Sequence, residues 1–160
     1  MKIAIYPGSF DPITNGHLDI LKRGAKIFDK VVIAVADNIR KESFFSARKR
    51  MELIRDCTKN YENVEIDRFK GLVVDYANSV NATVIIRGLR QVTDFEYEFQ
   101  MALMNRQLDE NIDTIFLMPH EKYTYLSSSV VREIAELDGD INRFVPNNVL
   151  QELKNKFRSS

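Results

Sequence analysis

Cysteine is nearly absent from this sequence: Cys57 is the only one in 160 residues. A disulfide within the chain is therefore excluded, and a single thiol is typical of a reducing cytoplasm, where we expect the protein to lie. Cys57 falls in the middle of a helical pattern and is interpreted as a packing residue. No apolar run is long enough to span a bilayer, and Pro7 and Gly8 cut short the apolar start that a signal peptide would need.

Net charge is also absent, because 23 basic residues balance 23 acidic ones. This balance, without an aromatic and basic stripe, argues against a nucleic-acid partner and against binding to a membrane surface. His120 has no cysteine or histidine at ligand spacing, so no protein-built metal site is predicted. The two common glycine-rich phosphate motifs, G-x-G-x-x-G and G-x-x-x-x-G-K-[ST], are missing as well.

What the sequence does contain is a repeated alternation of apolar, β-branched runs with segments of helical period. Strands are predicted at residues 3–6, 31–36, 64–69, 83–86 and 114–118. Helices are predicted at 17–28, 47–58, 72–80, 93–108, 129–137 and 148–157, with Ser46 capping the second and a Thr93–Glu96 capping box opening the fourth. We expect an α/β, Rossmann-like fold, a five-stranded parallel sheet with helices on both faces, forming a single domain over residues 1–160.

The loops that follow the predicted strands should form a ligand crevice, since ligands of open parallel sheets bind at the carboxyl ends of the strands. These loops are residues 7–16, 37–45, 70–71, 87–92 and 119–128. Nearly every unusual residue of the sequence falls in one of them. This coincidence indicates an enzyme.

The first loop, GSFDPITNGH, ends on His17 in the first turn of a predicted helix. Free N–H groups and the positive end of the helix dipole favour an anion there, and a histidine adds a directional donor. Gly8 would allow a close backbone approach or a positive φ, and Ser9 offers a hydroxyl. The alternative is a loop histidine that only caps the helix; the surrounding glycines, serine and proline favour the first interpretation.

Three other loops carry groups suited to phosphate. Arg40 and Lys41 follow the second strand, either facing the crevice or forming a solvated turn. Arg87 and Arg90 flank Gly88 after the fourth strand and could grip phosphate bidentately. Glu98 follows on the next helix, where it either turns back to the crevice or is an ordinary surface charge.

The last of these loops, YTYLSSSVVRE, brings three serines to a helix start, with Arg132 one turn further on. Serine hydroxyls and backbone N–H groups can form an anion nest, and the two tyrosines could flank a base. No signature of covalent catalysis accompanies these groups. A crevice rich in donors and without a nucleophile is typical of phosphoryl or nucleotidyl transfer, in which catalysis is largely positioning and charge stabilisation.

At this point the motifs resemble a known family. GSFDPITNGH is similar to the first motif of the HIGH-type nucleotidyltransferase superfamily, and SSSVVRE to its second. The narrower pattern of IRGLR followed by DFEYEFQMALMNR resembles the bacterial phosphopantetheine adenylyltransferases, over nearly the whole chain. The resemblance implies transfer of the adenylyl group of ATP to 4′-phosphopantetheine, which gives dephospho-coenzyme A and pyrophosphate, with Mg²⁺ accompanying the nucleotide.

The resemblance also implies roles for individual residues. His17 would stabilise the α-phosphate in the transition state. The implied phosphopantetheine site comprises Ser9, Lys41, Val73 and Arg87. The implied ATP site comprises Ser9, Phe10, His17, Gly88, Leu89, Arg90, Glu98, Tyr123, Thr124, Tyr125, Leu126, Ser127, Ser128 and Ser129. Ser9 stands where threonine is common, and Leu126 where isoleucine is usual; both changes keep the character of the side chain.

The family likeness further implies a homo-oligomer, usually a hexamer, and feedback inhibition by coenzyme A. The helix predicted at 93–108 is compatible with an oligomer, because it carries apolar residues on two faces and the sheet can cover only one. Two other interpretations stay open. One is another transferase of the superfamily, acting on nicotinate mononucleotide or glycerol phosphate, against which the Arg-Gly-Leu-Arg block argues. The other is a nucleotide sensor without catalysis, which would not need His17.

Overall fold

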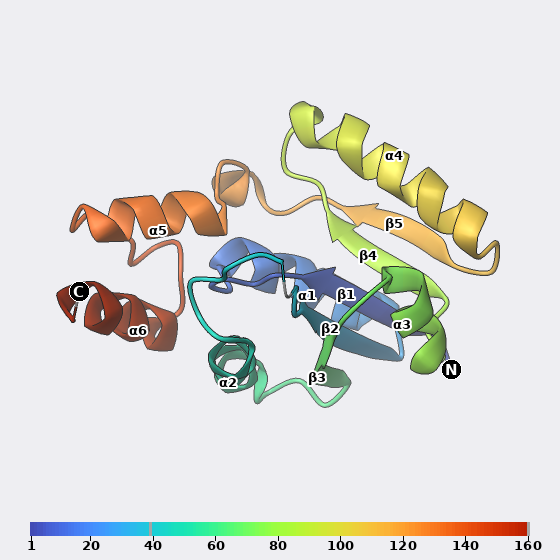
Figure 1. The fold of residues 1–160 in the computed structure, drawn as a ribbon, viewed down its shortest axis with the longest axis horizontal. Helices are drawn as coiled ribbons and strands as arrows, with labels where there is room; N and C mark the ends of the chain where they lie inside the picture. The colour runs from blue at the N-terminus through green and yellow to red at the C-terminus, as the bar shows by residue number, and fades with distance from the viewer. Residues whose placement is uncertain (39, 160) are drawn as a thin grey trace.

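The computed structural model describes residues 1–38 and 40–159 and contains a five-stranded sheet in which every pairing is parallel. Ile39, which falls in the predicted loop 37–45, lies outside the described residues. The strand order is β3-β2-β1-β4-β5 (Figure 1). The strands are β1 (Ile3–Gly8), β2 (Lys30–Ala36), β3 (Val64–Phe69), β4 (Val84–Gly88) and β5 (Asp113–Leu117).

The central strands form because their side chains are apolar on both sides of the sheet. Along β1, Ala4 and Tyr6 join one buried cluster, whereas Ile3 and Ile5 join the other. All five residues 31–35 of β2 are buried as well, so this strand is covered on both faces. The edge strand β3 alternates between partly covered and exposed residues from Val64 to Asp67, and it ends with the exposed Arg68 and the buried Phe69.

Six α-helices and one short 3₁₀ helix connect and cover these strands within the described residues. They are α1 (Asn15–Ile27), α2 (Ala47–Thr58), α3 (Val73–Ser79), α4 (Val92–Leu108), η1 (Glu121–Tyr123), α5 (Ser128–Glu136) and α6 (Asn147–Arg158). Ser46 caps α2 as predicted, its hydroxyl accepting a hydrogen bond from the N–H of Lys49 at 3.2 Å. The predicted Thr93–Glu96 capping box is wrong. Because α4 begins at Val92, the box is formed by Gln91 and Asp94 instead.

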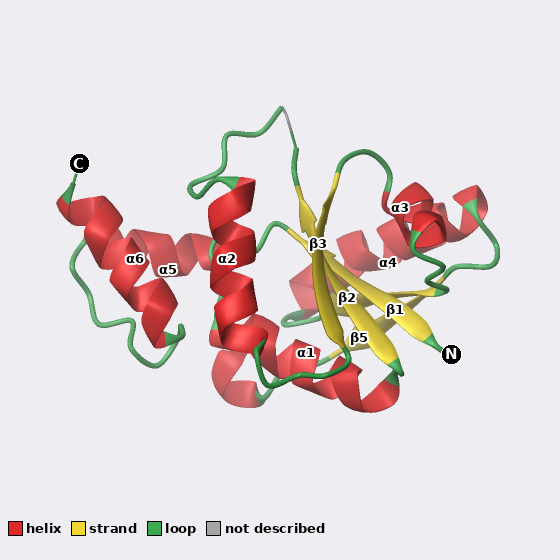
Figure 2. Cartoon of the chain, turned by 90° about the horizontal axis from the view of Figure 1, so that it is seen from below, coloured by secondary structure: helices red, strands yellow, loops and turns green. Residues whose placement is uncertain are grey.

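The helices lie on both faces of the sheet, as the sequence predicted. Residues of α1, α2, α5 and α6 pack with one face of β1 and β2 in the larger buried cluster, and α3 covers the opposite face. Figure 2 shows the sheet between these two groups, with α4 on the side of α3. The carboxyl-terminal helices therefore share the core of the sheet. Among the described helices, none is both long enough and apolar enough to cross a membrane.

The strand order places a switch point between β1 and β4. The chain leaves β1 toward β2 on one side of the sheet, and later returns to form β4 on the other side of β1. The loops that follow β1 and β4 therefore diverge, and a crevice opens between them. Gly8 and Ser9 lie at one side of this crevice, and Gly88 lies at the other.

Candidate active site

A cavity of ≈ 320 Å³ opens at this switch point. Its walls come from the end of β1 and the start of α1, the end of β4 with the first turns of α4, and the segment between β5 and α5. Of the residues predicted for ATP, the cavity is lined by Ser9, Phe10, His17, Gly88, Arg90, Glu98, Tyr123, Leu126, Ser127, Ser128 and Ser129. The fold thus brings together residues up to 120 positions apart, from Ser9 to Ser129.

His17 is fixed in the first turn of the helix α1 by a reciprocal pair of hydrogen bonds with Thr14. The backbone N–H of Thr14 donates to His17 Nδ1 at 3.0 Å, and the N–H of His17 donates to the Thr14 hydroxyl at 3.3 Å. Since Nδ1 accepts a hydrogen bond, the ring proton of the neutral imidazole is on Nε2. His17 therefore closes the helix cap through Nδ1, and its Nε2–H remains available to donate to a ligand. The two interpretations of this histidine, as a donor and as a cap, do not exclude each other.

The surroundings of His17 keep its imidazole neutral. Burial, together with the positive charges of Arg90 and Arg87, lowers the pKa of His17 from 6.5 to about 4. The ring of Phe10 packs edge-on against it, with 5.1 Å between ring centroids. At neutral pH this side chain is a rigid N–H donor without charge.

The positive φ expected near Gly8 falls on Phe10, which has φ of 46°. Gly8 is part of β1, and its role is spatial: a Cβ there would lie 3.1 Å from the Phe10 ring. The missing side chain leaves room for Phe10 to turn inward, and Phe10 is 2% exposed. The loop therefore buries the ring of Phe10 beneath His17 and leaves Ser9 at the surface of the cavity.

Arg87 and Glu98 form a bidentate ion pair at the edge of the cavity. Arg87 Nε donates to Glu98 Oε2 at 2.8 Å, and Nη2 donates to Oε1 at 2.6 Å. The third guanidinium nitrogen, Nη1, donates to the carbonyl of Pro7 at 3.0 Å. Burial alone would lower the pKa of Arg87, but its hydrogen bonds to Glu98 and the negative charge of that carboxylate outweigh burial and raise the pKa, so the charge is retained. Glu98 thus turns back to the crevice, as one interpretation of the sequence had it.

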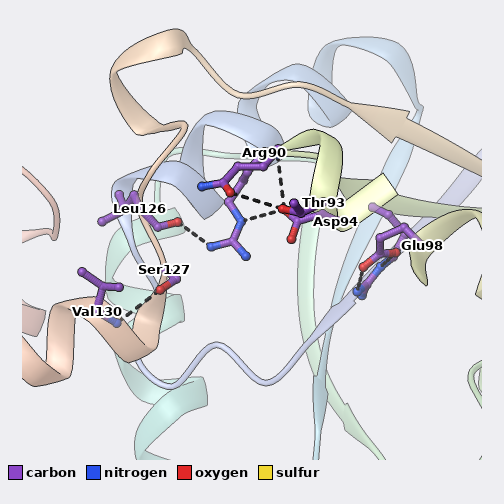
Figure 3. Close-up of polar contacts among 9 residues, drawn as sticks. Arg90, Thr93, Asp94, Glu98, Leu126, Ser127 and Val130 are labelled. Carbon is purple, nitrogen blue, oxygen red and sulfur yellow. Dashed lines mark hydrogen bonds and ion pairs between the residues drawn. The ribbon is translucent and has the colours of Figure 1, made fainter. Parts of the chain in front are cut away.

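Arg90 reaches across the cavity from the end of β4 to the segment before α5. Its Nη1 donates to the carbonyl of Leu126 at 2.7 Å, and its Nε lies 3.6 Å from the carboxylate of Asp94 (Figure 3). Ser127, the next residue, caps α5 by accepting a hydrogen bond from the N–H of Val130 at 3.2 Å. Arg90 therefore joins the two halves of the cavity wall.

The three serines at the start of α5 are not equivalent. Ser127 is the helix cap, and the hydroxyl of Ser128 donates to the carbonyl of Pro12 at 2.7 Å, which anchors the helix to the first loop. Ser129 is exposed and lines the cavity. The N–H groups of Ser128 and Ser129, in the first helical turn, have no acceptor within the helix and are the remaining donors here.

A second cavity, of ≈ 700 Å³, adjoins the first and shares Ser9, Ser128 and Ser129 with it. Lys41 lines this second cavity, as does Arg132, whose guanidinium donates to the carbonyl of Asp11. Arg40 is exposed and is not among its lining residues, which fits the interpretation of a solvated turn for that residue.

A third cavity, of ≈ 210 Å³, lies behind the ion pair and shares Arg87 and Glu98 with the first. Val73, the weakest of the residues implied by family likeness, lines it together with Tyr97 and Met101 of α4. Thr114 is also among its lining residues, and its hydroxyl is a buried atom for which the described residues provide no hydrogen-bond partner. The residues predicted for the acceptor therefore divide among three connected cavities.

Three residues predicted for ATP lie outside the lining of the first cavity. Leu89 donates its N–H to the carbonyl of Leu117 and so continues the edge of the sheet. Thr124 caps the 3₁₀ helix η1, and Tyr125 is 83% exposed. Only Tyr123 of the two tyrosines therefore faces the cavity. A contact with nucleotide stays a prediction for these three residues.

Two buried charged residues beside the site were not predicted to have roles. Asp11 accepts hydrogen bonds from the N–H groups of Phe44 and Phe45 at 2.6 and 2.8 Å. Arg50, which is 2% exposed, donates to three backbone carbonyls. Asp11 lies inside the quoted first motif, which was a usable signal. Arg50 looks like any helix-surface cation in the sequence, because nothing in the helical period distinguishes it from its charged neighbours.

Within residues 1–38 and 40–159, no cluster of three histidine, cysteine or acidic side chains could hold a metal ion. The two carboxylates of the first cavity are already engaged, Glu98 with Arg87 and Asp94 with Arg90. This donor set fits an ion that arrives on the phosphates of a nucleotide and keeps its water ligands, which is the usual habit of Mg²⁺.

Comparison with known proteins agrees with this geometry. Residues 5–134 match the cytidylyltransferase-like family model. A phosphopantetheine adenylyltransferase of Caldanaerobacter subterraneus subsp. tengcongensis is 56% identical over 160 residues, covering 100% of both chains. One from Alkaliphilus metalliredigens is 53% identical, covering 98% of this chain and 99% of the relative, and one from Clostridium perfringens is 48% identical, covering 99% and 97%.

Solved structures with low sequence identity share the fold. A putative nicotinate-nucleotide adenylyltransferase from Vibrio parahaemolyticus superposes with a TM-score of 0.74 at 18% identity, covering 100% of this chain and 98% of that one. The nicotinic acid mononucleotide adenylyltransferase of Plasmodium falciparum, complexed with NaAD, gives 0.72 at 14% identity, covering 96% and 95%. The Rossmann-like architecture predicted from the sequence is confirmed. Because the relatives named phosphopantetheine adenylyltransferase match nearly the full length of the chain at 48–56% identity, the chain belongs to the phosphopantetheine adenylyltransferases, within the cytidylyltransferase-like family.

Proposed function

We propose that this protein transfers the adenylyl group of ATP to 4′-phosphopantetheine, giving dephospho-coenzyme A and pyrophosphate in coenzyme A biosynthesis. Family membership supports the reaction class. The observation that carries the proposal is that three cavities adjoin one another and that the first contains a neutral histidine donor, His17: Ser9 lines the first and second cavities, and Arg87 lines the first and third. Two phosphorylated reactants can enter such a site from different sides and meet beside His17.

ATP occupies the first cavity in this proposal. Its adenosine lies between the end of β4, at Gly88 to Arg90, and the segment that contains Tyr123. Its phosphates run past His17 toward the start of α5, where Ser129 and the free N–H groups of the first turn lie. Arg90 is already extended across the cavity to Leu126, so it can contact the nucleotide without a large movement.

The acceptor occupies the other two cavities. Its phosphate lies at Ser9, where the second cavity brings Lys41 and the first brings Arg87. Its pantetheine arm extends past Arg87 into the third cavity, against Val73. That cavity has an apolar wall formed by Val73, Ile85, Met101 and Ala102, which suits the aliphatic part of the arm.

The chemistry is a direct in-line displacement without a covalent enzyme intermediate. An oxygen of the acceptor phosphate attacks the α-phosphorus, the bond from that phosphorus to the bridging oxygen breaks, and pyrophosphate leaves with the electron pair. The acceptor is already an anion near pH 7, so no residue needs to remove a proton. His17 Nε2–H and the guanidiniums stabilise the charge that develops on the α-phosphate. Mg²⁺ accompanies the ATP phosphates and neutralises part of their charge.

We also propose a homo-oligomer, built through α4. This helix exposes Phe95, Tyr97, Phe99, Leu103 and Met104 by 45–62% each, and Glu98 is the one buried residue among its described positions. Apolar exposure on this scale along one helix is unusual for a monomer. A second copy of the chain would cover it; a hexamer remains the number implied by family likeness.

Feedback inhibition by coenzyme A follows from the same site. Coenzyme A carries the pantetheine arm of the acceptor, so the third cavity that receives one can receive the other. Competition between coenzyme A and phosphopantetheine in initial-rate kinetics would support this inhibition, and purely non-competitive behaviour toward the acceptor would contradict it.

The proposed location is the cytoplasm, where a free thiol such as Cys57 stays reduced.

The decisive experiment measures pyrophosphate release with a panel of acceptors. Wild-type protein with MgATP should release pyrophosphate with phosphopantetheine, and not with nicotinate mononucleotide; CTP with glycerol phosphate should also give none. Release only with nicotinate mononucleotide would favour the rival transferase. Binding of ATP without release in any mixture would favour a nucleotide sensor. His17→Ala, assayed beside wild type, links the reaction to the cavity described above.

A further inference from the structure

Arg50 is buried beside the proposed acceptor site. It lies on α2, and the residue as a whole is 2% exposed. None of the ion pairs among residues 1–38 and 40–159 includes it. Burying a cation is costly unless hydrogen bonds compensate, so its partners indicate what this charge stabilises.

Those partners are three carbonyls from three different segments. Arg50 Nε donates to the carbonyl of Phe45 at 3.1 Å, in the segment before α2. Its Nη1 donates to the carbonyl of Ser9 at 2.7 Å and to that of Ala36, at the end of β2, at 2.9 Å. The planar guanidinium therefore fixes the loop after β1 relative to the loop after β2.

Asp11 makes the reciprocal connection between the same two loops. Its carboxylate, in the first loop, accepts hydrogen bonds from the N–H groups of Phe44 and Phe45 in the second, at 2.6 and 2.8 Å. Asp11 is 7% exposed, so these bonds are shielded from water. Together, Asp11 and Arg50 cross-link segment 9–11 to segment 44–45. We call this pair of residues and their backbone partners the loop clamp.

The loop clamp joins the two segments that carry the proposed acceptor contacts. Ser9 is the residue whose carbonyl Arg50 holds, and Lys41 lies four residues before Phe45 in the other segment. Both line the second cavity. Lys41 is exposed on a loop, so the place of its ammonium depends on how that loop is held. On the basis of the function proposed above, we propose that Arg50 and Asp11 are positioning residues for the acceptor phosphate.

Kinetics of three variants test this proposal. Arg50→Gln should raise the KM for phosphopantetheine by about 10-fold or more, as expected for lost hydrogen bonds to a charged group, while the KM for ATP changes by less than about 3-fold. Arg50→Lys, which retains the charge and can reach part of the carbonyl set, should show a smaller increase. If Arg50→Gln does not fold, the KM values of Arg50→Lys and Asp11→Asn test the proposal in its place.

Asp11→Asn separates positioning from simple electrostatics. Removing a negative charge near an anionic substrate would by itself lower the KM for phosphopantetheine. The loop clamp leads to the opposite expectation, a higher KM, because the amide of asparagine can accept only one of the two N–H groups well. Faster amide hydrogen exchange at Phe44 and Phe45 should accompany this change in both the Asp11 and the Arg50 variants.

Asn148→Ala is the matched control. Its side-chain amide donates to the carbonyl of Leu53 at 3.1 Å and so anchors the same helix α2 at a distance from the loops. It should lower the thermal midpoint without changing the ratio of the two KM values. An unchanged ratio in folded Arg50→Lys and Asp11→Asn would overturn the proposal. If wild-type protein releases no pyrophosphate with phosphopantetheine, the proposed function fails, and unchanged exchange at Phe44 and Phe45 would then also reject the loop clamp.

Discussion

Glu98 on α4 holds Arg87 at the end of β4 through two hydrogen bonds, of 2.8 and 2.6 Å, and both residues line the first and the third cavity of the site. Family likeness implied a contact between Glu98 and ATP. The structure instead engages both of its oxygens with Arg87, so the first effect of Glu98 on catalysis should pass through that guanidinium.

Glu98→Gln tests this relationship. The amide keeps the volume but loses the charge and one acceptor, so Arg87 should lose its fixed orientation. We expect the KM for phosphopantetheine to rise by about 10- to 100-fold, because a hydrogen bond to a charged group is worth about 1.5–3 kcal/mol. Steady-state kinetics with each substrate varied in turn would measure it. A change in the KM for ATP alone would instead support the contact implied by family likeness.

His17→Ala should lower kcat by about 10²–10³, the loss typical of one donor to a transition state. The KM values should change little, since the donor acts mainly on charge that develops during the reaction. His17→Gln can retain an N–H donor and should recover part of the rate. An unchanged kcat in the alanine variant would remove His17 from the mechanism.

The lowered pKa of His17 also predicts a pH dependence of folding stability. Burial lowers the pKa to about 4 in the folded protein, whereas the unfolded chain has the usual value of 6.5. Between these two values the unfolded state binds a proton that the folded state does not, so stability falls as pH falls through this window. Urea unfolding at pH 7 and pH 4.5 should show a smaller loss for His17→Gln than for wild type. Equal losses would contradict the expectation.

Lys41→Ala should weaken the acceptor without weakening the fold. Lys41 is exposed, so its removal should change the free energy of unfolding by less than about 0.5 kcal/mol. The KM for phosphopantetheine should rise by about 10-fold, the effect of losing one charged contact with phosphate. Glu42→Ala, at the neighbouring position of the same cavity, is the control and should not raise that KM.

Leu103→Arg should break the proposed oligomer. Leu103 is 48% exposed on α4, so an arginine there can be accommodated by a monomer but would carry a charge into a contact between copies. Light scattering should show a homo-oligomer for wild type at micromolar concentration and a smaller species for the variant. A wild-type monomer under these conditions would defeat the inference.

The local pattern of this sequence determined the elements and much of the site. Apolar runs such as residues 31–35 can be stable only as a strand covered on both faces, so alternation with helical segments was enough to predict a parallel sheet. Because the carboxyl ends of such strands meet at one edge, the sequence was enough to assign residues as far apart as His17 and Ser129 to one crevice.

Tertiary structure alone decided the partners of individual side chains. Helical period could not show that Arg50 is buried on carbonyls, that Glu98 pairs with Arg87, or that Tyr125 points to solvent while Tyr123 lines the cavity. The start of α4 was likewise misplaced, because the helix begins at Val92 and its capping box is formed by Gln91 and Asp94. The physical reason is that periodicity specifies which face of an element is apolar, whereas a hydrogen-bond partner is specified by where the other elements come to lie.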